Sequence, residues 1–264
     1  MYIKNISKRR KKLSKVIFIT GASSGFGRAC AYRFANNGWK LILTARRASR
    51  LNEIKAELSN ITSLITIPLD IRDEKCVRDA IDSLPKDFST IDVLLNNAGL
   101  ALGMEPAHEC NIEDWEVMID TNIKGLIYCT RYILPQMVEN NRGHIINIGS
   151  IAGTWAYPGI NVYGGTKAFV RQFSLNLRAD LYGSKVRVSL LDPGMAKSEF
   201  AKVRFKGDDL KANDVYGNAE VLKPSDIAEV VFWISSLPEH VNVNSIEVMP
   251  TCQTWGPLRI CKNE

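Results

Sequence analysis

Seven short apolar runs, separated by longer amphipathic stretches, constrain the fold of this chain more than any other feature. The runs are rich in Val, Ile and Leu and cover Val16–Thr20, Lys40–Thr44, Leu64–Leu69, Val93–Asn96, His144–Ile148, Val186–Leu191 and Ser245–Met249. Because both faces of these runs are apolar, we expect strands buried between two helix layers, as in a parallel sheet. With 264 residues, 45% of them hydrophobic, the chain can bury such a core within one domain.

The stretches between these runs have the periodicity of amphipathic helices. They predict helices over Gly25–Asn37, Leu51–Leu58, Lys75–Ser83, Trp115–Asn140, Tyr163–Leu181 and Ser225–Leu237. Ser225 is the expected N-cap of the last helix, and Pro135 is expected to kink or end the fourth. The strand–helix alternation predicts a single Rossmann-like α/β domain: a doubly wound parallel sheet of about seven strands with helices on both faces.

The positive net charge of +6 comes from the N-terminus. Setting aside the seven cations of residues 1–15 leaves 27 Lys and Arg residues against 28 Asp and Glu residues. We therefore expect a flexible basic extension over residues 1–14, followed by one nearly neutral domain over 15–264. Contact of the extension with acidic polymers or anionic lipid stays open, but nucleic acid is not an expected partner. The seven cations are Lys4, Lys8, Arg9, Arg10, Lys11, Lys12 and Lys15.

The remaining composition excludes several classes of protein. The six cysteines are scattered without a short-spaced pair, and the three histidines are far apart, so we expect reduced thiols and no metal site. No apolar run reaches the roughly 18 residues that a membrane span requires. These features predict a cytoplasmic protein without membrane partners, and a mitochondrial presequence is the weaker alternative.

A glycine-rich turn follows the first predicted strand and opens the first predicted helix. Glycines at such a turn let backbone N–H groups approach a pyrophosphate, and the N-terminus of the helix adds a favourable dipole. The turn therefore predicts dinucleotide binding, although a plain glycine-rich turn is the alternative. Its residues are Gly21, Ala22, Ser23, Ser24, Gly25, Phe26 and Gly27.

Two arginines at the end of the second predicted strand indicate which dinucleotide is bound. A carboxylate at this place would hold the 2′-hydroxyl of NAD, whereas an arginine accepts the 2′-phosphate of NADP. Here the strand runs into Arg46 and Arg47, with no Asp or Glu nearby in the sequence. The guanidinium groups can meet a phosphate with two parallel hydrogen bonds, so we expect NADP as the cofactor.

A tyrosine and a lysine four residues apart, Tyr163 and Lys167, would lie on one face of the predicted helix. An ammonium beside a phenol favours the phenolate, so we expect the pKa of Tyr163 to be lowered. The spacing alone is weak evidence. Ser150 strengthens it, because this hydroxyl follows the fifth strand, where α/β sheets place ligand-binding groups.

Taken together and in this order, the motifs resemble the short-chain dehydrogenase/reductase family over residues 15–264. Additional segments resemble the NADP-dependent 3-hydroxy acid dehydrogenase group of that family, which acts on serine-like and L-allo-threonine-like acids and reduces malonic semialdehyde. The family motifs are Gly21-x3-Gly25-x-Gly27, Asn96-Asn97-Ala98-Gly99, Asn122, Ser150, Tyr163-x3-Lys167 and Pro193-Gly194. The group-specific segments are 97–108, 161–163, 166–178 and 203–209.

The resemblance implies roles for the residues that carry it. Tyr163 would exchange a proton with the substrate oxygen, and Lys167 would bind the nicotinamide ribose and lower the tyrosine pKa. Ser150 would hydrogen-bond the substrate oxygen, and Asn122 would hold a water that links Lys167 to solvent. Further cofactor contacts are implied for Asp70 and Ile71 at the adenine, and for Asn97, Ala98, Gly99, Pro193, Gly194 and Ser198.

The segment 193–223 is long for a connection and is expected to form a lid over the substrate. Within it, Arg204 and Lys206 are the candidates for receiving a substrate carboxylate. The resemblance also implies a homotetramer. Two alternatives remain: a 3-oxoacyl-carrier-protein or general carbonyl reductase of the same family, and a protein that binds NADP as a sensor without catalysis.

Overall fold

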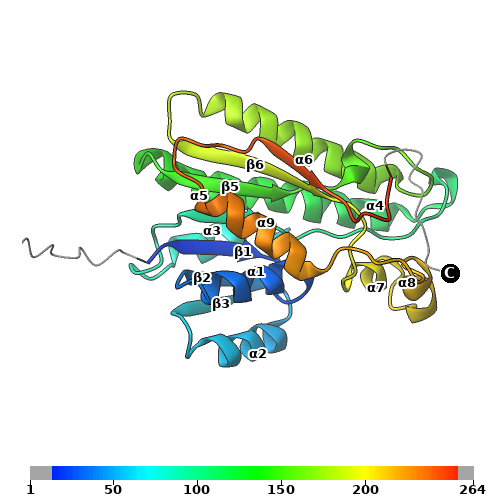
Figure 1. Cartoon of the computed structure of the whole chain (residues 1–264), viewed down its shortest axis with the longest axis horizontal. Helices are drawn as coiled ribbons and strands as arrows, with labels where there is room; N and C mark the ends of the chain where they lie inside the picture. Colours follow the sequence, from blue (N-terminus) through cyan, green and yellow to red (C-terminus); the bar gives the residue numbers. More distant parts are fainter. Residues whose placement is uncertain (1–13, 255–264) are drawn as a thin grey trace, which may run out of the picture.

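The computed structural model of this protein describes residues 14–254, so nearly all of the predicted N-terminal extension lies outside the described residues. One parallel sheet with the strand order β3-β2-β1-β4-β5-β6-β7 forms the centre of the molecule (Figure 1). This arrangement confirms the predicted doubly wound sheet. The strands are β1 (Val16–Thr20), β2 (Lys40–Ala45), β3 (Leu64–Pro68), β4 (Val93–Asn96), β5 (Gly143–Ile148), β6 (Val186–Pro193) and β7 (Ser245–Val248).

Helices cover both faces of the sheet because successive strand side chains point in opposite directions. In β1, Ile17 and Ile19 pack with α1 (Gly25–Ala35), α2 (Ala48–Leu58) and α9 (Pro224–Ser236), whereas Phe18 packs on the other face. That second face is covered by α3 (Glu74–Asp82), α5 (Leu126–Glu139) and α6 (Asn161–Asp180). Both helix layers close over a predominantly apolar core.

The long helix predicted over Trp115–Asn140 is three elements in the structure. It consists of α4 (Ile112–Ile119), a π-helical turn η2 (Asp120–Gly125) and α5 (Leu126–Glu139). Pro135 does not end the helix, because α5 continues to Glu139 with this proline inside it and exposed to solvent. The irregularity lies at η2 instead, and π turns inside helices are frequent at functional sites.

The predicted cap of α9 was wrong. The helix begins at Pro224, so Ser225 is already inside it, and proline is well suited to a first helical position because the N–H that it lacks would be unpaired there. The carboxylate of Asp226 accepts a hydrogen bond from the backbone N–H of Lys223 at 2.8 Å. This contact is the half of a capping box in which the third helical residue reaches back to the N-cap backbone.

The predicted lid segment, 193–223, contains two short helices, α7 (Phe200–Arg204) and α8 (Asp209–Asp214). In Figure 1 they lie together beyond the end of the sheet at which the strands finish. A small apolar cluster of their own, which includes Ala201, Ala212 and Tyr216, holds them together. The turns η1 (Ala107–Glu109) and η3 (Ile151–Gly153) are the remaining helical elements of the described chain.

Within residues 14–254, no helix has the length and apolar character to cross a bilayer. The same residues contain no cluster of three or more His, Cys, Asp or Glu side chains arranged to hold a metal ion. The five cysteines that fall in this range are unpaired, and two of them, Cys30 and Cys129, are buried in the core.

Candidate active site

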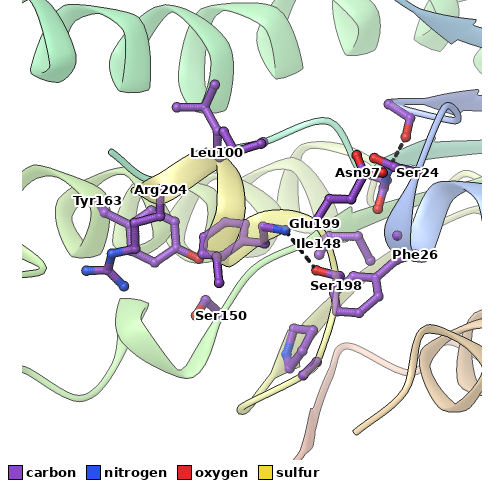
Figure 2. A pocket seen from close by; sticks show the side chains of 18 of the residues that line it. Ser24, Phe26, Asn97, Leu100, Ile148, Ser150, Tyr163, Ser198, Glu199 and Arg204 are labelled. Carbon is purple, nitrogen blue, oxygen red and sulfur yellow. Dashed lines mark hydrogen bonds between the residues drawn. The ribbon is translucent and has the colours of Figure 1, made fainter. Parts of the chain in front are cut away.

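A cavity of about 1040 Å³ opens at the carboxyl ends of the strands. Figure 2 shows Tyr163, Ser150 and Arg204 toward one end of it and Ser24, Phe26 and Asn97 toward the other. Almost all of the predicted site residues line this one cavity, and Ala22, Gly27 and Asn122 lie behind its wall. The predicted residues that line it are Gly21, Ser23, Ser24, Gly25, Phe26, Arg46, Arg47, Asp70, Ile71, Asn97, Ala98, Gly99, Ser150, Tyr163, Lys167, Pro193, Gly194, Ser198 and Arg204.

The turns that follow β1 and β4 are fastened to each other where the strand order reverses. The hydroxyl of Thr20 accepts hydrogen bonds from the backbone N–H groups of Asn97 (3.0 Å) and Ala98 (2.9 Å). Gly21 has a positive φ of 67°, and a Cβ at this position would lie 2.9 Å from the Cα of Ala98. Glycine is therefore required here by close packing as well as by backbone conformation. Sequence reasoning missed Thr20, although its place at the end of β1 was a signal.

The N-terminus of α1 points into the cavity, and no acidic side chain of its first turn balances the partial positive charge of the helix dipole. Ser24 is the N-cap residue but makes no side-chain capping bond, and the first turn contains no acidic residue. A Cβ at Gly25 would meet nothing nearer than the Ser198 side chain at 3.5 Å. Uncapped N–H groups and the helix dipole together favour an anion at this place. The predicted glycine turn thus fits a dinucleotide pyrophosphate.

Arg46 and Arg47 lie at the rim of the cavity, directly after β2. The Nη2 of Arg47 lies 3.1 Å from the Ser23 hydroxyl and 3.0 Å from the Ser24 hydroxyl. The guanidinium therefore stands beside the glycine turn, where the adenosine ribose of a dinucleotide would lie. This arrangement fits the 2′-phosphate of NADP.

The structure brings Ser150, Tyr163 and Lys167 together at the other end of the cavity. Ser150 and Tyr163 line the same part of the cavity, and the Ser150 hydroxyl is close enough to influence the pKa of the Tyr163 phenol. The Nζ of Lys167 lies 5.9 Å from the centre of the Tyr163 ring and donates to the carbonyl oxygen of Ile148 at 2.9 Å. The predicted phenol, ammonium and hydroxyl thus lie together at the end of the cavity that is away from the glycine turn.

The expected lowering of the tyrosine pKa is not found in the protein itself. Burial raises the pKa of the Tyr163 phenol to about 12, although the neighbouring Ser150 hydroxyl acts in the opposite direction. Burial also lowers the pKa of the Lys167 ammonium to about 8, and the carboxylate of Asp192 offsets part of this effect. The prediction from the sequence considered only the ammonium next to the phenol, whereas the loss of solvent is the largest influence on the pKa of this buried group.

Asp192 is a site residue that sequence reasoning missed. Its carboxylate is 1% exposed, accepts the backbone N–H of Ser150 at 2.9 Å and pairs with the guanidinium of Arg171 at 2.7 Å. Burial raises the pKa of Asp192 to about 6, while Arg171 and the Ser150 N–H act against that rise. Asp192 therefore fixes the backbone that carries the Ser150 hydroxyl. An acidic residue at a buried strand end, just before Pro193, was the available signal.

Asn122 lies in the π turn η2 and does not line the cavity. Its Nδ2 donates to the Leu100 carbonyl (2.8 Å) and to the Thr166 hydroxyl (3.0 Å), and its Oδ1 accepts the Leu100 N–H at 2.9 Å. Both N–H groups of the amide are thus used within the protein. Asn122 connects the turn after β4 to helix α6 through Thr166, another residue that the sequence did not single out.

Arg204 and Lys206 have different surroundings. The Arg204 guanidinium is buried, donates to the carbonyl oxygens of Gly103 (2.9 Å) and Gly159 (3.1 Å), and forms no ion pair with any Asp or Glu of residues 14–254. Lys206 pairs with Asp114 at 2.8 Å and is not part of the cavity wall. Of the two predicted candidates, Arg204 is the one that the structure places in the site.

Comparison with known proteins gives a consistent result. A model of the short chain dehydrogenase family matches residues 15–209. The NADP-dependent 3-hydroxy acid dehydrogenase YdfG of Salmonella typhi is 55% identical over 246 residues, which cover 93% of this chain and 98% of the relative. Sulfoacetaldehyde reductase 2 of Chromohalobacter salexigens is 51% identical, with coverage of 94% and 99%. The solved closed form of a serine dehydrogenase complexed with NADP+ is 53% identical at a TM-score of 0.89, with coverage of 94% of this chain and 100% of that structure.

Proposed function

The chain belongs to the short-chain dehydrogenase family, and from this premise we propose that it transfers a hydride between NADP and a small 3-hydroxy acid or its 3-oxo counterpart. One observation supports this function above the others. The Tyr163 phenol and the Ser150 hydroxyl lie in the same cavity as the buried guanidinium of Arg204. A 3-oxo acid has a carbonyl at one end, which would lie beside Tyr163 and Ser150. Its carboxylate at the other end would lie beside Arg204.

The residues that would hold NADP extend along the cavity. The N-terminus of α1 would receive the pyrophosphate, and Arg46 and Arg47 the 2′-phosphate. The adenine would lie at Asp70 and Ile71. Asn97, Ala98 and Gly99 would line the cofactor between the glycine turn and the nicotinamide. The nicotinamide end itself would contact Tyr163, Lys167, Pro193, Gly194 and Ser198. When bound, NADP supplies the hydride donor or acceptor.

In the reduction direction, the protein's own groups supply a proton and a hydrogen bond to the substrate oxygen. The raised pKa keeps the Tyr163 phenol protonated at neutral pH, which is the form that donates a proton to a carbonyl oxygen. The Ser150 hydroxyl would stabilise the negative charge that develops on the same oxygen. Lys167 remains mostly an ammonium at pH 7, and this positive charge lies 5.9 Å from the centre of the Tyr163 ring.

We assign two further residues to positioning. Asn122 would hold the turn at Leu100 against α6, which keeps Lys167 and Tyr163 in register with the wall of the cavity. Asp192 would hold Ser150 through its backbone N–H. The segment 193–223 would act as the lid, since Phe200 packs on the Tyr163 ring with a centroid distance of 5.6 Å.

A second candidate function is reduction of a small sulfonated aldehyde. The sequence similarity to a sulfoacetaldehyde reductase favours it, and the guanidinium of Arg204 pairs with a sulfonate as well as with a carboxylate. A 3-oxoacyl thioester has no anion close to its reacting carbon and would leave Arg204 buried without a counter-charge. A non-catalytic NADP sensor would have no need of Ser150, Tyr163 and Lys167 in one place.

A panel of substrates tests this proposal. The panel consists of L-serine, L-allo-threonine, malonic semialdehyde, sulfoacetaldehyde and an acetoacetyl thioester, each assayed with NADP(H) and with NAD(H). We expect the highest kcat/KM with malonic semialdehyde, and a preference for NADPH over NADH of about tenfold or more, because charge-assisted hydrogen bonds to the 2′-phosphate contribute roughly 1.5–3 kcal/mol. A higher kcat/KM with the thioester, or equal use of the two cofactors, would reject the assignment.

We also propose a homotetramer in the cytoplasm, as the family resemblance implies. Apolar side chains at the surface of α5, α6 and α9 support an assembly, namely Val138 (45% exposed), Leu175 (44%) and Trp233 (51%). These side chains lie on both helix layers, where they offer apolar surface for subunits to pack against. Light scattering on the purified chain is expected to give four times the mass of one subunit, and a monomer mass would refute the tetramer.

A further inference from the structure

A carboxylate from the segment 193–223 lies on the arginine that fits the 2′-phosphate. Glu199, the residue just before α7, accepts from the Nη1 of Arg47 at 2.9 Å and also pairs with Arg50. The sequence separation of Glu199 and Arg47 is 152 residues, so no local pattern indicates this contact. Figure 2 shows Glu199 between the Tyr163 end and the Ser24 end of the cavity.

The two edges of the Arg47 guanidinium have different partners. Its Nε and Nη2 lie against the hydroxyls of Ser23 and Ser24, and its Nη1 faces Glu199. The Glu199 and Arg47 side chains are 36% and 43% exposed, so solvent screens this pair only in part. Burial tends to raise the pKa of Glu199, but the hydrogen bonds from Arg50 and Arg47 have a larger combined effect. The pKa of Glu199 is therefore lowered overall. Glu199 is therefore an anion at neutral pH.

An anion at this place affects the two dinucleotides differently. The 2′-phosphate carries close to two negative charges, and a carboxylate on the same guanidinium repels it and uses one of its donors. NAD has only a 2′-hydroxyl there and experiences neither effect. The sequence around β2 has no acidic residue, but the fold brings one in from a distant segment.

On the basis of the proposed function, we propose that Glu199 competes with the 2′-phosphate of NADP for Arg47, and so sets both the affinity for NADP and the discrimination against NAD. When NADP binds, the 2′-phosphate must displace Glu199 from Arg47. Glu199 then retains its ion pair with Arg50. Glu199 thus weakens NADP binding while leaving NAD binding unaffected. It is a specificity-determining residue outside the reacting groups.

The variant Glu199→Gln tests this competition, because it keeps the size of the side chain and removes its charge. We expect the Kd of the full-length protein for NADPH to fall about threefold to tenfold, and the Kd for NADH to change by less than twofold. Titration calorimetry measures both. Adenosine 2′,5′-bisphosphate, which carries the 2′-phosphate without nicotinamide, should follow NADPH, and adenosine 5′-phosphate should follow NADH.

The matched control is Glu220→Gln, which removes one charge from the same segment at an exposed position. It should leave all four Kd values unchanged, which separates local competition from a change in net charge. If the wild-type protein binds NADPH but Glu199→Gln binds it equally or more weakly, the competition is overturned and Glu199 instead orients Arg47. If the wild-type protein does not bind NADPH at all, the proposed function itself fails.

Discussion

The variant Tyr163→Phe is expected to lower kcat for malonic semialdehyde by about 1000-fold or more, within the range that positioned acid–base groups contribute. The substitution removes the phenolic oxygen and keeps the ring that packs on Phe200. The Kd for NADPH is therefore expected to stay within about threefold of the wild-type value. Stopped-flow absorbance of the nicotinamide measures the first quantity, and fluorescence titration the second.

A matched control comes from Tyr216, another buried tyrosine in the wall of the same cavity. Its hydroxyl interacts with the backbone at Ser198 and Ala201 and lies outside the group formed by Ser150, Tyr163 and Lys167. Tyr216→Phe is expected to change kcat by less than about fivefold. Turnover of Tyr163→Phe at a level similar to that of this control would show that another group supplies the proton.

The second large effect is expected for Arg204→Met, which removes the cation and retains an apolar side chain. A buried charged pair that loses one partner costs about 2–5 kcal/mol, so kcat/KM for malonic semialdehyde should fall by about 100-fold to 1000-fold, mainly through KM. A neutral short-chain aldehyde has no carboxylate that could interact with Arg204. Its kcat/KM should stay within about tenfold of the wild-type value, measured under the same conditions.

The comparison of the two substrates separates recognition from damage to the fold. Arg204 also donates to the carbonyl oxygens of Gly103 and Gly159, so its replacement disturbs the two loops that carry them. Loop damage would lower activity with both aldehydes alike, and it would lower the melting temperature. Equal losses with charged and neutral substrates would therefore contradict a carboxylate at Arg204.

The sheet was predictable from the sequence because its five inner strands are buried on both faces, and the edge strands β3 and β7 are partly buried. Each appears as an isolated run of branched apolar residues, and the seven predicted runs match β1 to β7 apart from a few residues at their ends. The π turn at Asp120–Gly125 was not predictable in this way, since its residues continue a helical pattern. At Pro135, the absence of one backbone donor on a solvent-exposed face was not enough to end the helix.

The local motifs of the site were predictable, and its long-range contacts were not. The glycine turn, Arg46 and Arg47, and the pair Tyr163 and Lys167 each follow from spacing beside a predicted strand or helix. Asp192 and Glu199 act on groups 42 and 152 residues away, which only the folded chain brings near. The rise in the Tyr163 pKa has the same origin, because burial depends on side chains from several elements.

Direct hydride transfer within the cavity would place the transferred hydrogen on the carbonyl carbon of the 3-oxo acid. The most direct measurement follows deuterium from the transferable C4 position of labelled NADPH into the product of malonic semialdehyde reduction by mass spectrometry. The account predicts one deuterium per product molecule, bound to C3. A product without label, or no product from a protein that still binds NADPH, would contradict it.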